Sequence, residues 1–158
     1  MRIAVGSDER THLTDAVVAE LKRRGMAIEL VGALKEGDDS HWPQVGRRVA
    51  ELVAQGRCDE GILFCWTGTG VSMAANKVPG VRAALCGDPT TAAGARRWNH
   101  ANVLAMSLRL TSETVAKEIL EAWFTTPYGE GGDAQEVARL QEIERAYLGA
   151  QVLSKQIS

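Results

Sequence analysis

The sequence predicts an α/β fold in which one parallel sheet of five strands carries helices on both faces. Strand-like and helix-like segments alternate along the 158 residues, with no internal repeat and no low-complexity linker. Short apolar runs are followed by segments in which apolar residues recur at helical spacing. This alternation is typical of a doubly wound, Rossmann-like sheet. The length suits a single domain, residues 1–158, with one core.

In the first half of the chain, glycine and proline mark where the helices begin and end. Gly25 suits the position just after a helix, and Gly56 ends the next one. Pro43 is well placed in the first turn of that second helix, where no backbone donor is needed. The elements expected here are a strand over 2–6, a helix with Leu13, Val17 and Leu21 on its apolar face, a strand over 27–34, a helix with Val45, Val49, Leu52 and Val53, and a strand over 60–64.

The second half continues the alternation and adds a C-terminal helix. Asp88 and Pro89 form a cap and first-turn pair, and Thr111 or Ser112 caps the helix that follows the fifth strand. The last helix or tail, residues 133–158, follows a glycine-rich loop, and we expect it to pack on a partner subunit. The remaining elements expected are a helix opening over 71–77, strands over 81–86 and 102–106, and a helix through Val115, Ile119 and Trp123.

Composition excludes several classes of partner. A formal net charge of −2 and a pI near 5.9 give no basic surface for nucleic acid. No apolar run approaches a membrane span, and residues 1–5 enter a strand rather than a signal sequence, so we expect a cytoplasmic protein. Cys58, Cys65 and Cys86 form no disulfide framework and no CxxC pair, which fits a reducing compartment and argues against structural zinc.

A glycine-rich segment, residues 65–77, is the clearest functional signal. Cys65 ends an apolar strand, and the glycines that follow allow a sharp turn into a helix whose free amides can face an anion. Beside such amides a thiol can be held as thiolate, although Cys65 can equally be a small buried residue. A dinucleotide fingerprint needs glycine where Met73 stands, and a P-loop needs glycine before Lys77, so both motifs are excluded.

Polar side chains follow several strands at the carboxyl edge, where ligands of doubly wound sheets usually bind. Asp8 follows the first strand, Cys65 the third and Cys86 the fourth, with Ser107 and Arg109 after the fifth. Asp8 can instead be a helix cap, and Arg109 an ordinary surface cation.

Four segments together resemble the family of type B ribose-5-phosphate isomerases and galactose-6-phosphate isomerase subunits, over nearly the whole length of the protein. They read IAVGSD over 3–8, CWTGTG over 65–70 with AANK over 74–77, GVRAALC over 80–86, and NVLA over 102–105. The resemblance implies the doubly wound fold already expected. It also implies a homodimer or dimer of dimers with sites between subunits.

The resemblance further implies aldose–ketose interconversion, in which a base moves a proton between adjacent carbons through an enediol. Cys65 matches the base, and Thr67 matches a hydroxyl that assists proton movement. Asn102 matches a residue that bonds sugar hydroxyls. No metal and no cofactor are required, because backbone amides steady the oxyanion. The amides of this anion hole are those of Gly68, Thr69, Gly70, Val71 and Ser72.

The sequence departs from the family pattern at substrate-facing positions. Glu9 stands where the family has histidine beside Asp8, and Trp98 replaces the ring-opening histidine before Asn99. After the glycine-rich loop, Asp133 stands in a segment that usually supplies phosphate-binding arginines. Two carboxylates in place of cations repel a phosphate dianion, each by on the order of 1 kcal/mol or more in a partly buried site.

The sequence therefore predicts an isomerase acting on a sugar or sugar derivative other than ribose 5-phosphate, such as an unphosphorylated sugar, an acyclic sugar or a deoxy sugar acid. The alternatives are a sugar-phosphate isomerase whose phosphate is held by Arg109 and other basic residues, and a noncatalytic sugar-binding or partner subunit. His100, two residues beyond Trp98, is a candidate replacement for the missing imidazole.

Overall fold

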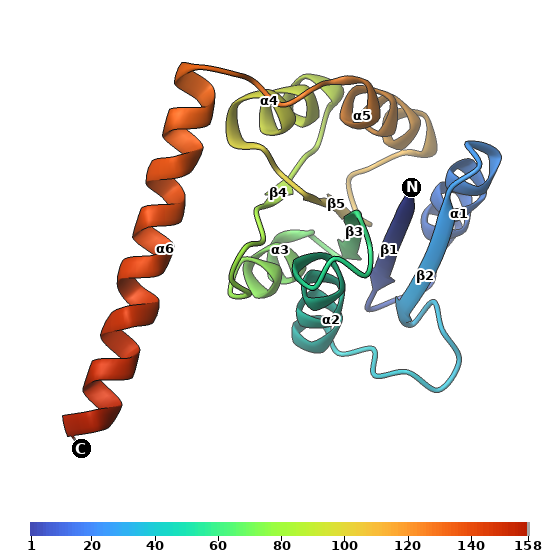
Figure 1. Ribbon diagram of the computed structural model, residues 1–158. Helices are drawn as coiled ribbons and strands as arrows, with labels where there is room; N and C mark the ends of the chain where they lie inside the picture. The colour runs from blue at the N-terminus through green and yellow to red at the C-terminus, as the bar shows by residue number, and fades with distance from the viewer. Residues whose placement is uncertain (158) are drawn as a thin grey trace.

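The protein folds as three layers, with a parallel sheet between two layers of helices (Figure 1). The computed structural model describes the backbone of residues 1–157 and the side chains of residues 1–149. The predicted α/β architecture is confirmed. The five strands are β1 (Arg2–Ser7), β2 (Ala27–Gly32), β3 (Glu60–Cys65), β4 (Ala83–Leu85) and β5 (Val103–Ser107).

The sheet order is β2-β1-β3-β5-β4, and every neighbouring pair is parallel. β3 lies at the centre and is buried along its whole length, which explains its unbroken apolar run. The crossover through α1 leads from β1 to β2 on one side of β1, whereas β3 pairs with its other side. The strand order reverses direction between β1 and β3, and such a switch point opens a crevice at the carboxyl edge.

Each face of the sheet has its own apolar cluster. Helices α1 (His12–Arg23), α4 (Pro89–Asn99) and α5 (Glu113–Thr125) cover one face, where Trp123 is fully buried. Helices α2 (Trp42–Ala54) and α3 (Thr69–Ala75) cover the other. Residues of β1 and β3 alternate between the two clusters, as the two-residue period of a strand requires.

Two strands are shorter than the sequence predicts. β2 ends at Gly32 because its partner β1 ends at Ser7, which pairs with that residue. The Gly32 N–H then donates to the Asp38 carboxylate at 2.9 Å, which turns the backbone toward α2. β4 keeps only 83–85, because Asn76 bonds both the N–H and the C=O of Ala83 and Val81 joins a turn instead.

The predicted helix boundaries hold where a cap defines them. Asp88 caps α4 by accepting the Thr91 N–H at 2.8 Å, and Ser112 rather than Thr111 caps α5. Gly25 follows α1 with φ of +75°, the left-handed conformation expected there. α3 begins and ends two residues earlier than the predicted 71–77, because Gly68 serves as its N-cap.

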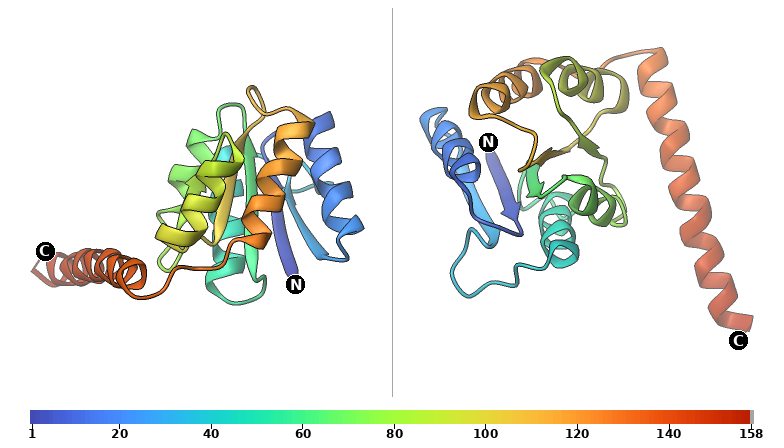
Figure 2. Two further views of the ribbon diagram at one scale, coloured as in Figure 1. Left: turned by 90° about the horizontal axis from the view of Figure 1, so that it is seen from above. Right: turned by 180° about the vertical axis from the view of Figure 1, so that it is seen from behind.

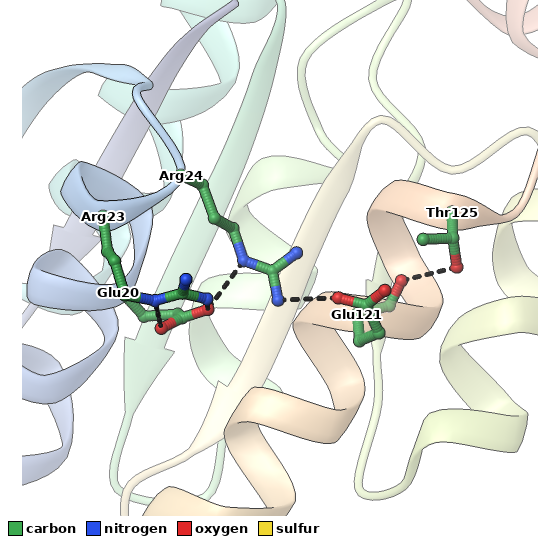
Figure 3. Close-up of polar contacts among 5 residues, drawn as sticks. All are labelled: Glu20, Arg23, Arg24, Glu121 and Thr125. Atoms are coloured by element: carbon green, nitrogen blue, oxygen red, sulfur yellow. Dashed lines mark hydrogen bonds and ion pairs between the residues drawn. The ribbon is translucent and has the colours of Figure 1, made fainter.

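A series of ion pairs ties α1 to α5 on the outside of the domain (Figure 3). Glu20 accepts hydrogen bonds from Arg23 at 2.6 and 2.8 Å and from Arg24 at 2.8 Å. Arg24 also donates to Glu121 of α5 at 2.9 Å. The two arginines lower the pKa of Glu20 to about 2, through the Arg23 hydrogen bonds first.

A second charged cluster is buried at the amino edge of the sheet. Glu60, the first residue of β3, pairs with Arg96 at 2.8 Å and accepts the indole N–H of Trp123 at 2.5 Å. Arg96 also lies over the rings of Trp123 and Tyr128. This cluster joins α4, α5 and the loop that leads to α6.

Helix α6 (Gly132–Ile157) stands beside the domain, as Figure 1 and the rear view in Figure 2 show. It covers the predicted C-terminal helix, whose residue 158 lies outside the described residues. Its start packs on α4, and Glu144 accepts the Gly80 N–H at 3.1 Å. None of the helices in the described part of the protein is long and apolar enough to cross a bilayer. Several apolar side chains of α6 are exposed: Leu140, Ile143, Tyr147 and Leu148.

Candidate active site

The carboxyl ends of β1 and β3 bring the first candidates together. Asp8 directly follows β1, Cys65 is the last residue of β3, and the two strands are hydrogen-bonded neighbours. Arg109 lies two residues beyond β5, on the other side of β3. The sheet therefore places all three residues at the crevice where the strand order reverses.

Cys65 is buried, with 5% of its surface exposed, on the face covered by α2 and α3. Its carbonyl accepts the N–H groups of Gly68 at 3.2 Å and Leu108 at 3.0 Å. These two bonds hold the loops after β3 and β5 around the thiol. The position of Cys65 is thus fixed by the backbone on both sides.

Gly68 makes the turn from β3 into α3. Its φ is +78°, and a Cβ atom there would lie 2.5 Å from Leu85 Cδ1 and 2.9 Å from the carbonyl carbon of Met106. Glycine is therefore required both by backbone conformation and by the approach of β5. The turn starts α3 immediately after the Cys65 strand.

The five amides proposed as an anion hole are not equally available. Gly68 donates to the Cys65 carbonyl at 3.2 Å, and Ser72 donates to the Gly68 carbonyl at 3.3 Å. The amides of Thr69, Gly70 and Val71 have no partner among the described residues. The first turn of α3 thus offers three donors, because the first amides of a helix lack an intrahelical acceptor. The amides of Gly68 and Ser72, by contrast, are already paired within the turn.

Two hydroxyls lie at the same turn. Thr67 Oγ1 and Thr69 Oγ1 are 2.7 Å apart and share one hydrogen bond. A hydroxyl in such a pair can donate to one group while accepting from another. This arrangement suits the proton-passing role expected of Thr67.

Asp8 is placed to interact with a ligand. Its Oδ1 is buried and has no hydrogen-bond partner among the described residues. Burial raises the pKa of Asp8, and the charge of Glu9 adds to that effect, while a hydrogen bond to its own backbone opposes it. Ser7 fixes the turn, since its Oγ donates to the Glu9 carbonyl at 2.5 Å. Asp8 is not the cap of α1, which is Thr11.

Arg109 is exposed at this edge, and its backbone N–H donates to the Trp66 carbonyl at 3.0 Å. The Ser107 hydroxyl donates to the same carbonyl at 2.9 Å. The Arg109 guanidinium has no carboxylate partner within the described side chains. It is a cation available to an anionic ligand.

The other predicted site residues lie at the opposite edge of the sheet. Trp98, Asn99 and His100 end α4, which runs back from the carboxyl edge, and Asn102 directly precedes β5. They do not lie beside Cys65 of the same subunit. This separation from Cys65 could have been predicted from the sequence, because residues that precede a parallel strand lie at the amino edge of the sheet.

Two of these residues have structural roles. Asn102 accepts the Arg82 N–H at 2.8 Å and donates to the Gly80 carbonyl at 3.0 Å, so its side chain is already used. His100 has φ of 48° at the end of α4, stacks on Tyr128 at 4.5 Å, and its Nε2 lies 2.8 Å from the Gly129 carbonyl. The sequence-based roles of both in sugar binding are not supported by this geometry.

Trp42 belongs to the carboxyl edge, although the sequence did not single it out. A Cβ atom on Gly70 would lie 3.0 Å from Cδ2 and Cε3 of Trp42, so the indole lies directly against the glycine-rich turn. Trp42 is 45% exposed. The only signal in the sequence was a tryptophan before the proline that opens α2.

Comparison with known proteins identifies the family. The family model described as Ribose/Galactose Isomerase matches residues 3–143. The chain belongs to the ribose/galactose isomerase family. Ribose-5-phosphate isomerase B of Escherichia coli (strain K12) is 37% identical over 145 residues, which cover 91% of this sequence and 97% of that protein. D-erythrulose-4-phosphate isomerase of Pectobacterium atrosepticum is 33% identical over 145 residues, covering 91% and 95%.

The solved structures of the family share the fold. Ribose-5-phosphate isomerase B of Clostridium thermocellum superposes with a TM-score of 0.86 at 38% identity, covering 93% of this protein and 99% of that one. The enzyme of Mycoplasma genitalium with bound ribulose-5-phosphate gives 0.81 at 30% identity, covering 91% and 95%. The predicted family and the enzyme class, an aldose–ketose isomerase, are confirmed.

In this ribose/galactose isomerase, the predicted site is divided between two edges of one sheet. Cys65, the amides of α3, Asp8 and Arg109 are at the carboxyl edge, and Trp98 and Asn99 are at the amino edge. Asp133, in the first turn of α6, belongs with the second group, because α5 has already returned the backbone to that edge.

Proposed function

We propose that this isomerase moves a proton between adjacent carbons of a sugar through an enediol, with Cys65 as the base. The observation that carries the proposal is the position of Cys65 at the end of β3. It lies next to three amides at the start of α3 that have no partner in the described part of the protein. A base and an oxyanion-binding turn within one short segment are the two groups that enediol chemistry requires.

Each group has a separate task in this mechanism. The Cys65 thiolate takes the proton from the carbon beside the carbonyl and returns it to the neighbouring carbon. The amides of Thr69, Gly70 and Val71 donate to the oxygen on which negative charge develops. The Thr67 hydroxyl passes a proton between the two substrate oxygens, supported by its bond to Thr69.

We place ribose 5-phosphate among the poor substrates. Glu9 is an exposed carboxylate beside Asp8, and two negative charges at that turn oppose a phosphate dianion. Arg109 is a cation at this edge that has no carboxylate partner among the described side chains, whereas Arg10 pairs with Asp15. One guanidinium suits a carboxylate or a single anionic group. Our leading proposal is a sugar that is unphosphorylated or carries a carboxylate.

A second copy of the protein would complete the site. Trp98, Asn99 and Asp133 can meet Cys65 only across a subunit interface, because they lie at the other edge of their own sheet. The exposed apolar side chains of α6 support a homodimer or dimer of dimers. Light scattering should give a mass above that of one subunit.

The role of Cys65 is tested by Cys65→Ala, with Cys58→Ala as the matched control. Both cysteines are free and buried, but Cys58 precedes β3 and lies at the amino edge. We expect Cys65→Ala to abolish isomerisation and solvent proton exchange, and Cys58→Ala to retain both. Near-normal turnover by folded Cys65→Ala would require another base.

The substrate is tested by comparing ribose 5-phosphate with D-ribose and with sugar acids of equal length. We expect the phosphorylated sugar to be the poorest of the three. Turnover of ribose 5-phosphate at the rate of a working enzyme would show that cations elsewhere in the assembly bind the phosphate, and would refute the electrostatic argument.

A second candidate is a short sugar phosphate. The relative from Pectobacterium atrosepticum is named for D-erythrulose 4-phosphate, and it matches 91% of this sequence. That sugar has no free hydroxyl that could close a five-membered ring, so it needs no ring-opening group. Turnover of D-erythrulose 4-phosphate but not of D-ribose would favour this candidate.

A further inference from the structure

A cyclic sugar must open before enediol chemistry can begin, because the carbonyl and its acidic neighbouring C–H exist only in the acyclic form. The protein has three histidines, His12, His41 and His100. Trp98 has no imidazole and cannot carry a proton to a ring oxygen. The structure distinguishes the three imidazoles by where they lie.

His100 is excluded because its imidazole is already engaged: the ring stacks on Tyr128, and Nε2 lies 2.8 Å from the Gly129 carbonyl. His12 starts α1 at the carboxyl edge, but α1 covers the face opposite to the Cys65 side chain, and its Nε2 is paired with Glu113 of α5. His41 directly precedes α2, which covers the same face as Cys65. His41 is therefore the imidazole on the correct edge and face.

The His41 imidazole is oriented by a carboxylate. Nδ1 lies 2.7 Å from Asp39 Oδ1, and the backbone N–H of His41 donates to the same oxygen at 2.9 Å. These bonds lower the pKa of Asp39, so the carboxylate is an ionised acceptor at neutral pH. Nδ1 then carries the proton of the neutral ring, and Nε2 keeps its lone pair with no partner among the described residues.

The turn that carries this pair is anchored at the carboxyl end of β2 and on α2. Asp38 anchors it through the Gly32 N–H at 2.9 Å and Arg48 at 3.1 Å. The next residue after His41 is Trp42, whose indole lies against Gly70 in the anion-binding turn. The His41 side chain is 87% exposed, so a ligand at this edge can reach it.

We propose that His41, oriented by Asp39, opens the cyclic form of the sugar at the Cys65 site. Nε2 takes the proton of the anomeric hydroxyl, and the O–H electron pair forms the carbonyl. The ring C–O bond breaks with its electron pair on the ring oxygen, and the imidazolium returns the same proton to that oxygen. No other reactant is consumed. The inference rests on the proposed isomerase function, which it extends to the ring-opening step.

The test separates ring opening from isomerisation by using Cys65→Ala as the parent protein. Exchange between the anomers of D-ribose and of D-glucuronate, labelled at C1, is followed by NMR. We expect Cys65→Ala to accelerate exchange of at least one of these sugars. Adding His41→Ala should remove about 10²-fold of that acceleration, and free imidazole should restore part of it. Adding His12→Ala should leave it unchanged.

Equal acceleration with and without His41, or none by the Cys65→Ala parent, would overturn the inference. These outcomes differ from a failure of the proposed function, which would appear as isomerisation that survives Cys65→Ala. Asp39→Asn tests the orienting role of Asp39. It should slow anomer exchange in the Cys65→Ala parent. In the protein that keeps Cys65, it should leave unchanged the turnover of D-erythrulose 4-phosphate, a sugar with no ring to open.

Discussion

Replacing Gly68 by alanine should damage both the stability and the chemistry of this isomerase. The residue has φ of +78°, and left-handed backbone costs a residue with a side chain about 1–2 kcal/mol. The added Cβ would lie 2.9 Å from the carbonyl carbon of Met106, a backbone atom of β5. Because β5 is an interior strand and cannot move freely, overpacking adds about 1–3 kcal/mol.

Gly25→Ala is the matched control, since Gly25 has φ of +75° and no atom within 4 Å of the Cβ position. It carries the conformational cost without the steric one. In urea unfolding, we expect Gly68→Ala to lower the free energy of unfolding by about 2–5 kcal/mol and Gly25→Ala by about 1–2 kcal/mol. The difference between the two variants measures the clash with β5 and Leu85.

Activity provides the second measurement. A shift of the Gly68 turn displaces the amides of Thr69, Gly70 and Val71, and losing one oxyanion donor typically lowers kcat by about 10²-fold or more. Gly25→Ala should keep the turnover of the wild type. If Gly68→Ala unfolds no more easily than Gly25→Ala and keeps full turnover, the close approach to β5 and the role of the amides are both refuted.

Three further predictions concern side chains away from this turn. Asn102→Ala should lower the free energy of unfolding by about 1–3 kcal/mol, because a backbone donor and a backbone acceptor lose their partner. It should leave kcat of the folded enzyme unchanged. A fall in kcat with no loss of stability would instead indicate that Asn102 binds the sugar. Arg96→Met should cost about 3–5 kcal/mol in urea unfolding, because Glu60 keeps a buried charge without its ion pair; a loss below about 1 kcal/mol would contradict this. Glu20 has a pKa of about 2 in the folded protein, compared with 4.5 for an exposed carboxyl group. The ionised Glu20 therefore stabilises the fold fully above pH 4.5, and this stabilisation declines as the pH falls toward 2. Glu20→Gln should remove this acid dependence of the stability, which is worth about 1 kcal/mol because Arg23 is exposed. Melting curves of the wild type and the variant across that pH range test this prediction. Identical curves would show that the ion pairs contribute nothing.

Much of the fold could be predicted because its signals are local. The apolar run over β3, the Asp88 cap with Pro89, and Gly25 after α1 each act through neighbours within a few residues. The strand boundaries that were predicted wrongly depend on residues far away in the sequence. β2 ends where β1 ends, and β4 is shortened by the side chain of Asn76.

The sequence by itself determined the family, the place of Cys65 at the end of a buried strand, and the glycines of the turn that follows. Only the tertiary structure decided which candidates share one edge of the sheet. It separates Trp98, Asn99 and Asn102 from Cys65 and commits Asn102 to backbone groups 20 and 22 residues away. It also places Trp42, the residue after His41, against Gly70. The physical reason is that caps and turns act over a few residues, whereas these contacts form only when β1, β3 and β5 pair and their helices return across the sheet.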